Sequence, residues 1–235
     1  MNYQWATASH KGRVRTNNED AVYPDTAGST DAGVLLLLAD GMGGHVAGEV
    51  ASSTAIEAAR STDGSVDERV KAANQAILAK VADDPKLAGM GTTITMLELK
   101  PGRQGTFGHV GDSRAYLFRA GKLEQVTVDH TIVTEYLRAG KITPEQAVDH
   151  PQRNMITRAL GLIPDIDVDM FDMSFEPGDR VLLCSDGVSD MIADNGIADA
   201  LKSKSTAEEA VWELVERANK AGGHDNITAL VVDIT

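Results

Sequence analysis

Cysteine, aromatic residues, basic residues and long apolar runs are all scarce in this sequence. Cys184 is the single cysteine among 235 residues, which excludes a disulfide framework and favours a reducing compartment. The longest apolar run spans residues 34–39, far below the roughly 20 residues that cross a bilayer. The N-terminal residues lack the basic-then-apolar order of a signal peptide. We therefore expect a cytoplasmic protein without a membrane partner, although the chain could be part of a longer, anchored one.

The shortage of basic residues gives the chain a strong negative charge. Lys and Arg number 22 against 35 Asp and Glu, a formal net charge of −13 at pH 7. Such a surface repels the backbone of nucleic acids, so no nucleic-acid partner is expected. A phosphoryl dianion would be repelled as well. An enzyme of this charge that acted on phosphate esters would need cations bound at its site.

Secondary-structure signals divide the chain into runs of strands and pairs of helices. No internal repeat, low-complexity tract or linker interrupts it, which indicates one domain. Helices are predicted over 46–60, from a capping box at Ser65, and from Thr206 to Gly222. Strands are predicted over 3–9, 33–39, 92–99, 104–111, 113–119, 122–127, 166–173, 179–185 and 226–234. This order favours the α+β class, as a four-layer α-β-β-α sandwich of two antiparallel sheets flanked by paired helices.

Carboxylates stand at the ends of several predicted strands. Asp40 and Asp186 each follow an apolar run and precede glycine, Asp112 follows a strand, and Asp225 precedes one. The Glu19-Asp20 pair comes after the first strand. Asp-Gly pairs also make ordinary turns. However, each of these two pairs comes at the end of an apolar run that is long enough to be buried on both faces. Unpaired carboxylates at such a rim would be costly.

Divalent cations account for these carboxylates better than arginine partners, because basic residues are few. Oxygen ligands suit Mg²⁺ or Mn²⁺, and no His- or Cys-rich pattern indicates zinc. Arg15 is poorly placed as a carboxylate partner and well placed to bind phosphate oxygens, the alternative being a surface ion pair with Glu19. Asp167 and Asp169 alternate with apolar residues, which is typical of a solvated strand face.

Six motifs, in order and over nearly the whole chain, resemble those of the metal-dependent, type 2C serine/threonine protein phosphatases of bacteria. They are RTNNED at 15–20, DGMGGH at 40–45, GTT at 91–93, GDSR at 111–114, SDG at 185–187 and DNIT at 225–228. The resemblance implies hydrolysis of phosphoserine and phosphothreonine in proteins, in opposition to serine/threonine kinases. It also implies direct attack by a water that bridges two metal ions, without a covalent intermediate. Residues 130–165 correspond to the family's flap, and we expect a monomer.

The resemblance assigns roles residue by residue. Asp40 would bridge two ions, with the Gly41 carbonyl on the first, while Asp186 and Asp225 would hold the second. Asp112 with Asp186 would form a third site. Asp20 and Glu19 would orient water at the metal site, and Asn226 would support that site. Arg15 would bind the substrate phosphate, and His45 would donate a proton to the leaving group. The eukaryotic motif commonly has a histidine where Met42 stands, so the identity of the general acid stays open.

Two other classes of function remain as alternatives. One is a di-metal hydrolase that acts on small phosphoesters, against which the acidic surface and the scarcity of aromatic residues weigh. The other is a catalytically weak regulator that binds phosphoproteins, which the full set of metal-site aspartates disfavours. A cysteine phosphatase is excluded, because the position six residues after Cys184 is Asp190 and not arginine.

Overall fold

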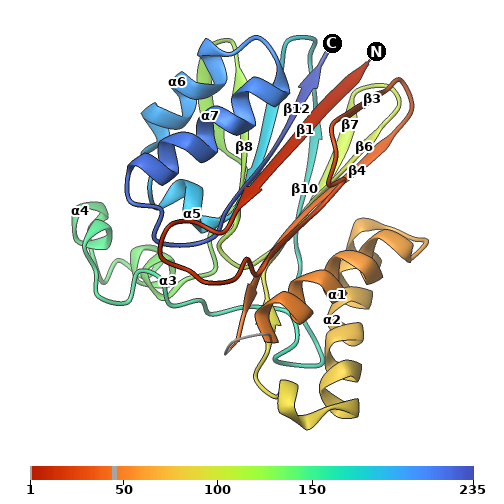
Figure 1. Ribbon diagram of the computed structural model, residues 1–235, viewed down its shortest axis with the longest axis vertical. Coiled ribbons are helices and arrows are strands. Elements are labelled where there is room, and N and C mark those ends of the chain that lie inside the picture. Colours follow the sequence, from red (N-terminus) through yellow and green to blue (C-terminus); the bar gives the residue numbers. More distant parts are fainter. Residues whose placement is uncertain (1, 44–46) are drawn as a thin grey trace.

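Two antiparallel sheets pack face to face, with a pair of long helices on each outer side (Figure 1). The computed structural model describes residues 2–43 and 47–235. This arrangement confirms the predicted four-layer sandwich. The chain ends lie side by side at one end of the sandwich, on β1 and β12 (Figure 1). The longer helices are α1 (Ala47–Ser61), α2 (Val66–Asp83), α6 (Asp194–Ser203) and α7 (Ala207–Lys220).

The first sheet contains both chain ends. Its strand order is β3-β1-β12-β11-β8-β9, and β1 pairs with β12 along its whole length, from Tyr3 with Ile234 to His10 with Ile227. Since β11 also runs antiparallel to β12, the ends of β1 and β11 lie beside the start of β12. The strands are β1 (Tyr3–His10), β3 (Gly28–Thr30), β8 (Arg114–Arg119), β9 (Lys122–Gln125), β11 (Arg180–Cys184) and β12 (Ile227–Ile234).

The second sheet has the order β10-β7-β6-β4-β2, with the short β5 paired to the end of β4. The register of β2 against β4 places Asp20 directly opposite Asp40. The strands are β2 (Asp20–Tyr23), β4 (Val34–Met42), β5 (Gly91–Thr92), β6 (Ile94–Lys100), β7 (Gln104–Val110) and β10 (Asp169–Ser174).

Apolar side chains fill three layers of core. One layer lies between the sheets and includes Leu36, Leu38 and Leu230. A second lies under α6 and α7, and a third under α1 and α2, which includes Leu37. Strands covered on both faces need apolar residues at every position rather than at alternate ones. This explains the continuous run that ends at Asp40, in which residues 36–39 are fully buried.

Two of the predicted helices begin where a side chain caps them. The Ser65 capping box begins α2 and the Thr206 hydroxyl caps α7. The sequence prediction missed α6, which starts after Ala193 without a side-chain cap and carries Gly196 in its first turn. It also missed β2 and β3, each four residues or shorter. Short, partly buried strands leave little periodicity to detect.

Two short helices occupy the segment that the sequence assigns to a flap. They are α3 (Ile132–Arg138) and α4 (Pro144–Val148), and neither buries any of its residues. The Thr143 capping box begins α4, as its sequence indicates. In Figure 1 the two helices lie to one side of the sheets, near α5 (Asp186–Ser189). The division of the chain into one catalytic domain with a flap at about 130–165 stays a prediction.

In the described part of the chain, none of the helices combines the length and the apolar character that spanning a membrane requires.

Candidate functional site

The predicted site residues gather at one end of the sandwich, where strands of both sheets begin or end. Asp40 belongs to the end of β4 in the second sheet, and Asp186 follows β11 in the first. Asp225 precedes β12. The two sheets are joined here by a hydrogen bond, in which the Ser185 hydroxyl donates to Asp20 Oδ2 at 2.9 Å. The site therefore lies between the sheets and draws on both.

A cavity of about 430 Å³ opens at this end. Five carboxylates and one guanidinium line it, together with Met42 and three flap residues. The charged residues are Glu19, Asp40, Asp112, Asp186 and Asp225, with Arg15 as the cation. Asp20 does not line the cavity. It accepts a hydrogen bond from Ser185, next to Asp186, and it lies opposite Asp40 in the β2–β4 register. The structure thus brings together all the predicted metal-site residues. His45 lies outside the described residues, so its predicted role is untested.

The backbone around Asp40 is held by polar contacts from β5 and β6. The Thr93 hydroxyl accepts from the Asp40 N–H at 2.9 Å, and the Thr92 hydroxyl donates to the Asp40 carbonyl at 2.8 Å. Gly41 packs against the first turn of α1, where an added Cβ would stand 2.1 Å from the Gly48 carbonyl oxygen. Glycine is required there because no side chain fits between strand and helix.

Asn226 fastens the loop that carries Arg15 and Glu19. Its Oδ1 accepts from the Glu19 N–H at 2.8 Å, and its Nδ2 donates to the carbonyls of Lys11 and Asn17 at 3.0 and 2.8 Å. These three bonds tie residues 11–19 to the start of β12. Asn226 thus positions this loop, while its support of a metal site stays a prediction.

The carboxylates of the site raise one another's pKa. Burial raises the pKa of Asp20 to about 6 and that of Asp112 to about 7, and neighbouring aspartates add to both shifts. Burial and then mutual repulsion raise the pKa of Asp40 and of Asp186 well above the ordinary range. All four groups are thus disfavoured as anions by their surroundings.

Arg15 does not stand apart from the carboxylates. Its Nη2 lies 2.5 Å from Asp225 Oδ2, and this bond raises the pKa of the guanidinium. The expectation that Arg15 is poorly placed as a carboxylate partner is therefore wrong, and the partner is Asp225 rather than the alternative, Glu19. The contact arises because Asn226, the neighbour of Asp225, ties down the loop that carries Arg15.

The donor set suits a hard divalent cation. Asp20 Oδ1 and Asp186 Oδ1 are buried, and neither has a hydrogen-bond partner in the described part of the chain. Such groups are costly unless a cation or donor compensates them. No three His, Cys, Asp or Glu side chains in residues 2–43 and 47–235 converge closely enough to hold a metal ion as they stand.

The sequence left the role of Asp190 open, between a plain cap or turn and support of Asp186, and it misjudged Asp169. Asp190 lines a second cavity of about 260 Å³ that shares Asp112, Asn154 and Asp186 with the first. Its spacing of four from Asp186 was a usable signal, because such residues share a helix face. The sequence assigns Asp169 to a solvated strand face. That prediction is wrong, because Asp169 forms an ion pair with Arg158 at 2.6 Å. Alternation alone cannot show that an arginine arrives from a distant loop.

Without divalent cations, the protein should become less stable as the pH rises from about 4 to 7. A carboxyl whose pKa is higher in the folded state than its unfolded value of about 4 takes up a proton on folding, so the free energy of unfolding falls as pH rises through this window. Asp112, with a folded pKa of about 7, should contribute roughly 2 kcal/mol or more. The measurement is thermal unfolding in EDTA between pH 4.5 and 7.5, compared with Asp112→Asn. The melting temperature of the variant should gain on that of the wild type by roughly 5 °C across this range. A constant difference would contradict the assigned pKa.

Comparison with known proteins relates the whole chain to one family. Residues 8–231 match the family model described as protein phosphatase 2C. The serine/threonine protein phosphatase PstP of Mycobacterium tuberculosis is 45% identical over 240 residues, which is 98% of this chain but only 45% of that protein. The chain thus spans less than half the length of this relative. The serine/threonine phosphatase stp of Listeria monocytogenes is 37% identical over 95% of this chain and 92% of its own length.

Solved structures agree with the fold. The crystal structure of the M. tuberculosis phosphatase PstP/Ppp superposes with a TM-score of 0.91 at 43% identity, over 100% of this chain and 99% of that one. A second structure, of the PstP catalytic domain in complex with two manganese ions, gives a TM-score of 0.87 at 40% identity, over 100% and 99%.

Proposed function

The chain belongs to the protein phosphatase 2C family, and from this premise we propose that it hydrolyses phosphoserine and phosphothreonine in proteins with bound Mn²⁺ or Mg²⁺. The observation that supports this most directly is the cavity with five carboxylates and one arginine. An acidic chain can accept a phosphoryl dianion there only if cations neutralise the wall. Two manganese ions are named for the related PstP structure.

Different residues of the cavity wall would hold different ions. Asp40, the Gly41 carbonyl, Asp186 and Asp225 would hold two core ions, and Asp112 with Asp186 would hold a third. Asp20 and Glu19 would orient water at the site. Bound divalent cations would supply positive charge to the phosphoryl oxygens and lower the pKa of an attacking water. The two buried carboxylate oxygens without a partner among the described residues, on Asp20 and Asp186, support this division.

Arg15 would bind the phosphoryl oxygens in a bidentate manner. For this, the guanidinium exchanges the carboxylate of Asp225 for phosphate. Their side chains are 51% and 36% exposed, and ion pairs this open contribute about 1 kcal/mol or less. The exchange therefore costs little, and it leaves Asp225 available to an ion.

The leaving alkoxide needs a proton, and His45 is the proposed donor among this chain's side chains. Met42, which lines the cavity where the eukaryotic motif has histidine, cannot supply one. The substrates would be products of serine/threonine kinases, since those enzymes make the esters that this site would cleave.

The direct test is turnover of a phosphothreonine peptide in Mn²⁺, beside p-nitrophenyl phosphate and a nucleoside monophosphate. The proposal expects hydrolysis of the phosphopeptide in preference to the nucleotide. Preference for the nucleotide would favour the small-phosphoester hydrolase. Tight binding of the phosphopeptide without hydrolysis would favour the regulator.

Asp112→Ala should lower turnover at limiting Mn²⁺ and leave it nearly intact at saturating Mn²⁺. The side chain belongs to the proposed third site only, so the two core ions keep their ligands. The measurement is the Mn²⁺ concentration for half-maximal activity, which should rise roughly tenfold on removal of one ligand or its support. Equal loss at every Mn²⁺ concentration would assign Asp112 to the core instead.

A further inference from the structure

Two adjacent polar residues, Asp129 and His130, stand between β9 and the first flap helix and have no part in the proposed chemistry. His130 is only 4% exposed, and the Asp129 side chain is 14% exposed. Each is turned toward the loop between β7 and β8, which carries Asp112 at its centre. Buried polar groups at this level call for a structural explanation.

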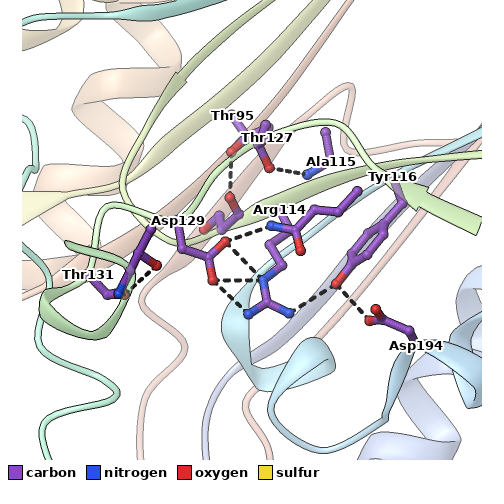
Figure 2. A network of polar contacts seen from close by, with 11 residues as sticks. Thr95, Arg114, Ala115, Tyr116, Thr127, Asp129, Thr131 and Asp194 are labelled. Carbon is purple, nitrogen blue, oxygen red and sulfur yellow. Dashed lines mark hydrogen bonds and ion pairs between the residues drawn. The ribbon is translucent and has the colours of Figure 1, made fainter. Parts of the chain in front are cut away.

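Asp129 binds the residue that lies two positions after Asp112. Arg114 donates from Nε to both oxygens of Asp129 at 3.0 Å, and from Nη2 to Oδ2 at 2.6 Å. Figure 2 shows the Arg114 guanidinium between Asp129 on one side and the Tyr116 hydroxyl on the other. The Tyr116 hydroxyl in turn donates to Asp194. Arg114 is thereby fixed at both edges of its guanidinium plane.

His130 binds the residue directly before Asp112. The Gly111 N–H donates to the ring nitrogen Nδ1 of His130 at 3.0 Å. The backbone N–H of His130 donates to the Gly111 carbonyl at 2.8 Å. Because Nδ1 accepts the hydrogen bond from the Gly111 N–H, the ring is neutral, and burial, which lowers the pKa of His130, favours the same form. With Nδ1 as acceptor, the ring proton is on Nε2, which lies 3.3 Å from Asp169 Oδ2. Arg158 Nη1 lies 3.0 Å from Nε2, and in this tautomer it donates to the other oxygen of Asp169, at 2.6 Å, rather than to the ring.

The loop at Asp112 is held from its other side as well. The Ser113 hydroxyl shares a hydrogen bond of 2.8 Å with Thr93, and the Thr95 hydroxyl donates to the Ser113 carbonyl at 3.1 Å. Gly111 has φ +114°, a left-handed conformation that glycine alone adopts readily. The glycine permits this turn without enforcing it, so the two bonds from His130 select the conformation on the Gly111 side.

The same residue anchors the flap. The His130 carbonyl accepts from the Thr157 N–H at 2.8 Å, and the Ile132 N–H donates to the Met155 carbonyl at 3.0 Å. The two chain segments at the base of the flap, residues 130–132 and 155–157, are therefore hydrogen-bonded to each other beside His130. Since neither flap helix buries a residue, this base carries much of the flap's attachment.

We propose that His130 is a positioning residue, which sets the orientation of Asp112 through Gly111 and ties it to the base of the flap, with Asp129 holding the other side of the loop. The inference rests on the proposed function, because it assumes that Asp112 takes part in holding an ion. Partners that orient metal ligands typically change metal affinity about 10- to 100-fold when removed.

The test compares two substitutions that separate the ring nitrogens. The amide oxygen in His130→Asn can stand where Nδ1 stands and accept from Gly111. The amide in His130→Gln reaches the position of Nε2 and leaves the Gly111 N–H without its acceptor. We expect His130→Gln to bind its weakest Mn²⁺ ion roughly tenfold less tightly, by electron paramagnetic resonance of free Mn²⁺, and His130→Asn to stay within about threefold of the wild type. Amide exchange at Gly111 should accelerate in His130→Gln alone.

Arg180→Met is the control for lost stability. Arg180 binds Asp233 and the carbonyls of Leu201 and Lys204 at the start of β11, the end of that strand opposite Asp186. It should lower the melting temperature without changing Mn²⁺ affinity or Gly111 exchange. If His130→Gln does not fold, Asp169→Asn takes its place, because it removes the charge that orients Nε2; a weakening of roughly threefold or more is then expected.

Unchanged Mn²⁺ affinity in His130→Gln, or equal weakening in His130→Asn and His130→Gln, would overturn the inference. The same holds for unchanged affinity in Asp169→Asn where it is the variant used. These readouts do not depend on turnover. A wild type that binds Mn²⁺ but hydrolyses no phosphopeptide would refute the proposed function and leave the His130 comparison readable.

Discussion

Asp40→Asn is expected to lower turnover of a phosphothreonine peptide in saturating Mn²⁺ by roughly a thousandfold or more. In the proposed arrangement Asp40 bridges two ions, so the amide removes a negative charge from both at once. Metal-derived stabilisation of the transition state is worth several kcal/mol, and each 1.36 kcal/mol changes the rate tenfold. The fold should survive, because Asp40 lies beyond the buried run of β4 and its backbone contacts do not depend on its side chain.

The comparison for this variant is Asp31→Asn, at an exposed position outside the cavity. Circular dichroism should match the wild type in both variants, and Asp31→Asn should also keep the wild-type melting temperature. In metal-free protein Asp40→Asn should even melt higher than the wild type, because it removes one of the repelling carboxylates. A rate near that of the wild type in Mn²⁺ would show that Asp40 is not the bridging ligand.

Removal of divalent cations should abolish turnover, and Mn²⁺ should restore it. Without cations the cavity presents five carboxylates to the substrate dianion and one arginine, itself bound to Asp225. Electrostatic repulsion then opposes both binding and catalysis. Dialysis against EDTA, followed by graded addition of Mn²⁺, is the measurement, and we expect activity to fall at least about a hundredfold.

Binding should also stabilise the fold, since a ligand at 100 times its Kd adds about 2.7 kcal/mol to the free energy of unfolding. The melting temperature should therefore rise with Mn²⁺ and should not respond to Na⁺ at matched ionic strength. Turnover that persisted in EDTA, with a melting temperature unchanged by Mn²⁺, would contradict a metal-dependent mechanism.

The strands of the core were predictable because burial leaves a simple signal. Residues 36–39 and 181–184 read as apolar runs, and each leads directly to an aspartate of the site. The clustering of Asp40 with Asp186 followed from chemistry, because both carboxylates end such a run. Helices with side-chain caps, such as the one at Ser65, were equally readable.

Contacts between distant segments were not predictable in the same way. The Arg15–Asp225 pair joins residues 210 positions apart, and Arg158 reaches Asp169 from the base of the flap. Nothing in local periodicity records such encounters. The role of the Asp129-His130 pair was hidden for the same reason, since its partners lie in a loop some twenty residues earlier in the chain. The uncapped α6 adds a local example, because a helix with alanine at the N-cap position lacks the usual start signal.

The hydrogen bond from Ser185 to Asp20 crosses from one sheet to the other, so the site is split between the two halves of the sandwich. Chain segments connect these halves, and the leucine-rich layer packed between the sheets sets how they align. The proposed phosphatase activity should therefore depend on how well the side chains of that layer pack. A substitution that lets the sheets slide by less than an ångström would part Asp40 from Asp186 while both sheets stayed intact. Heating should therefore reduce the proposed phosphatase turnover at a lower temperature than the one that unfolds the strands.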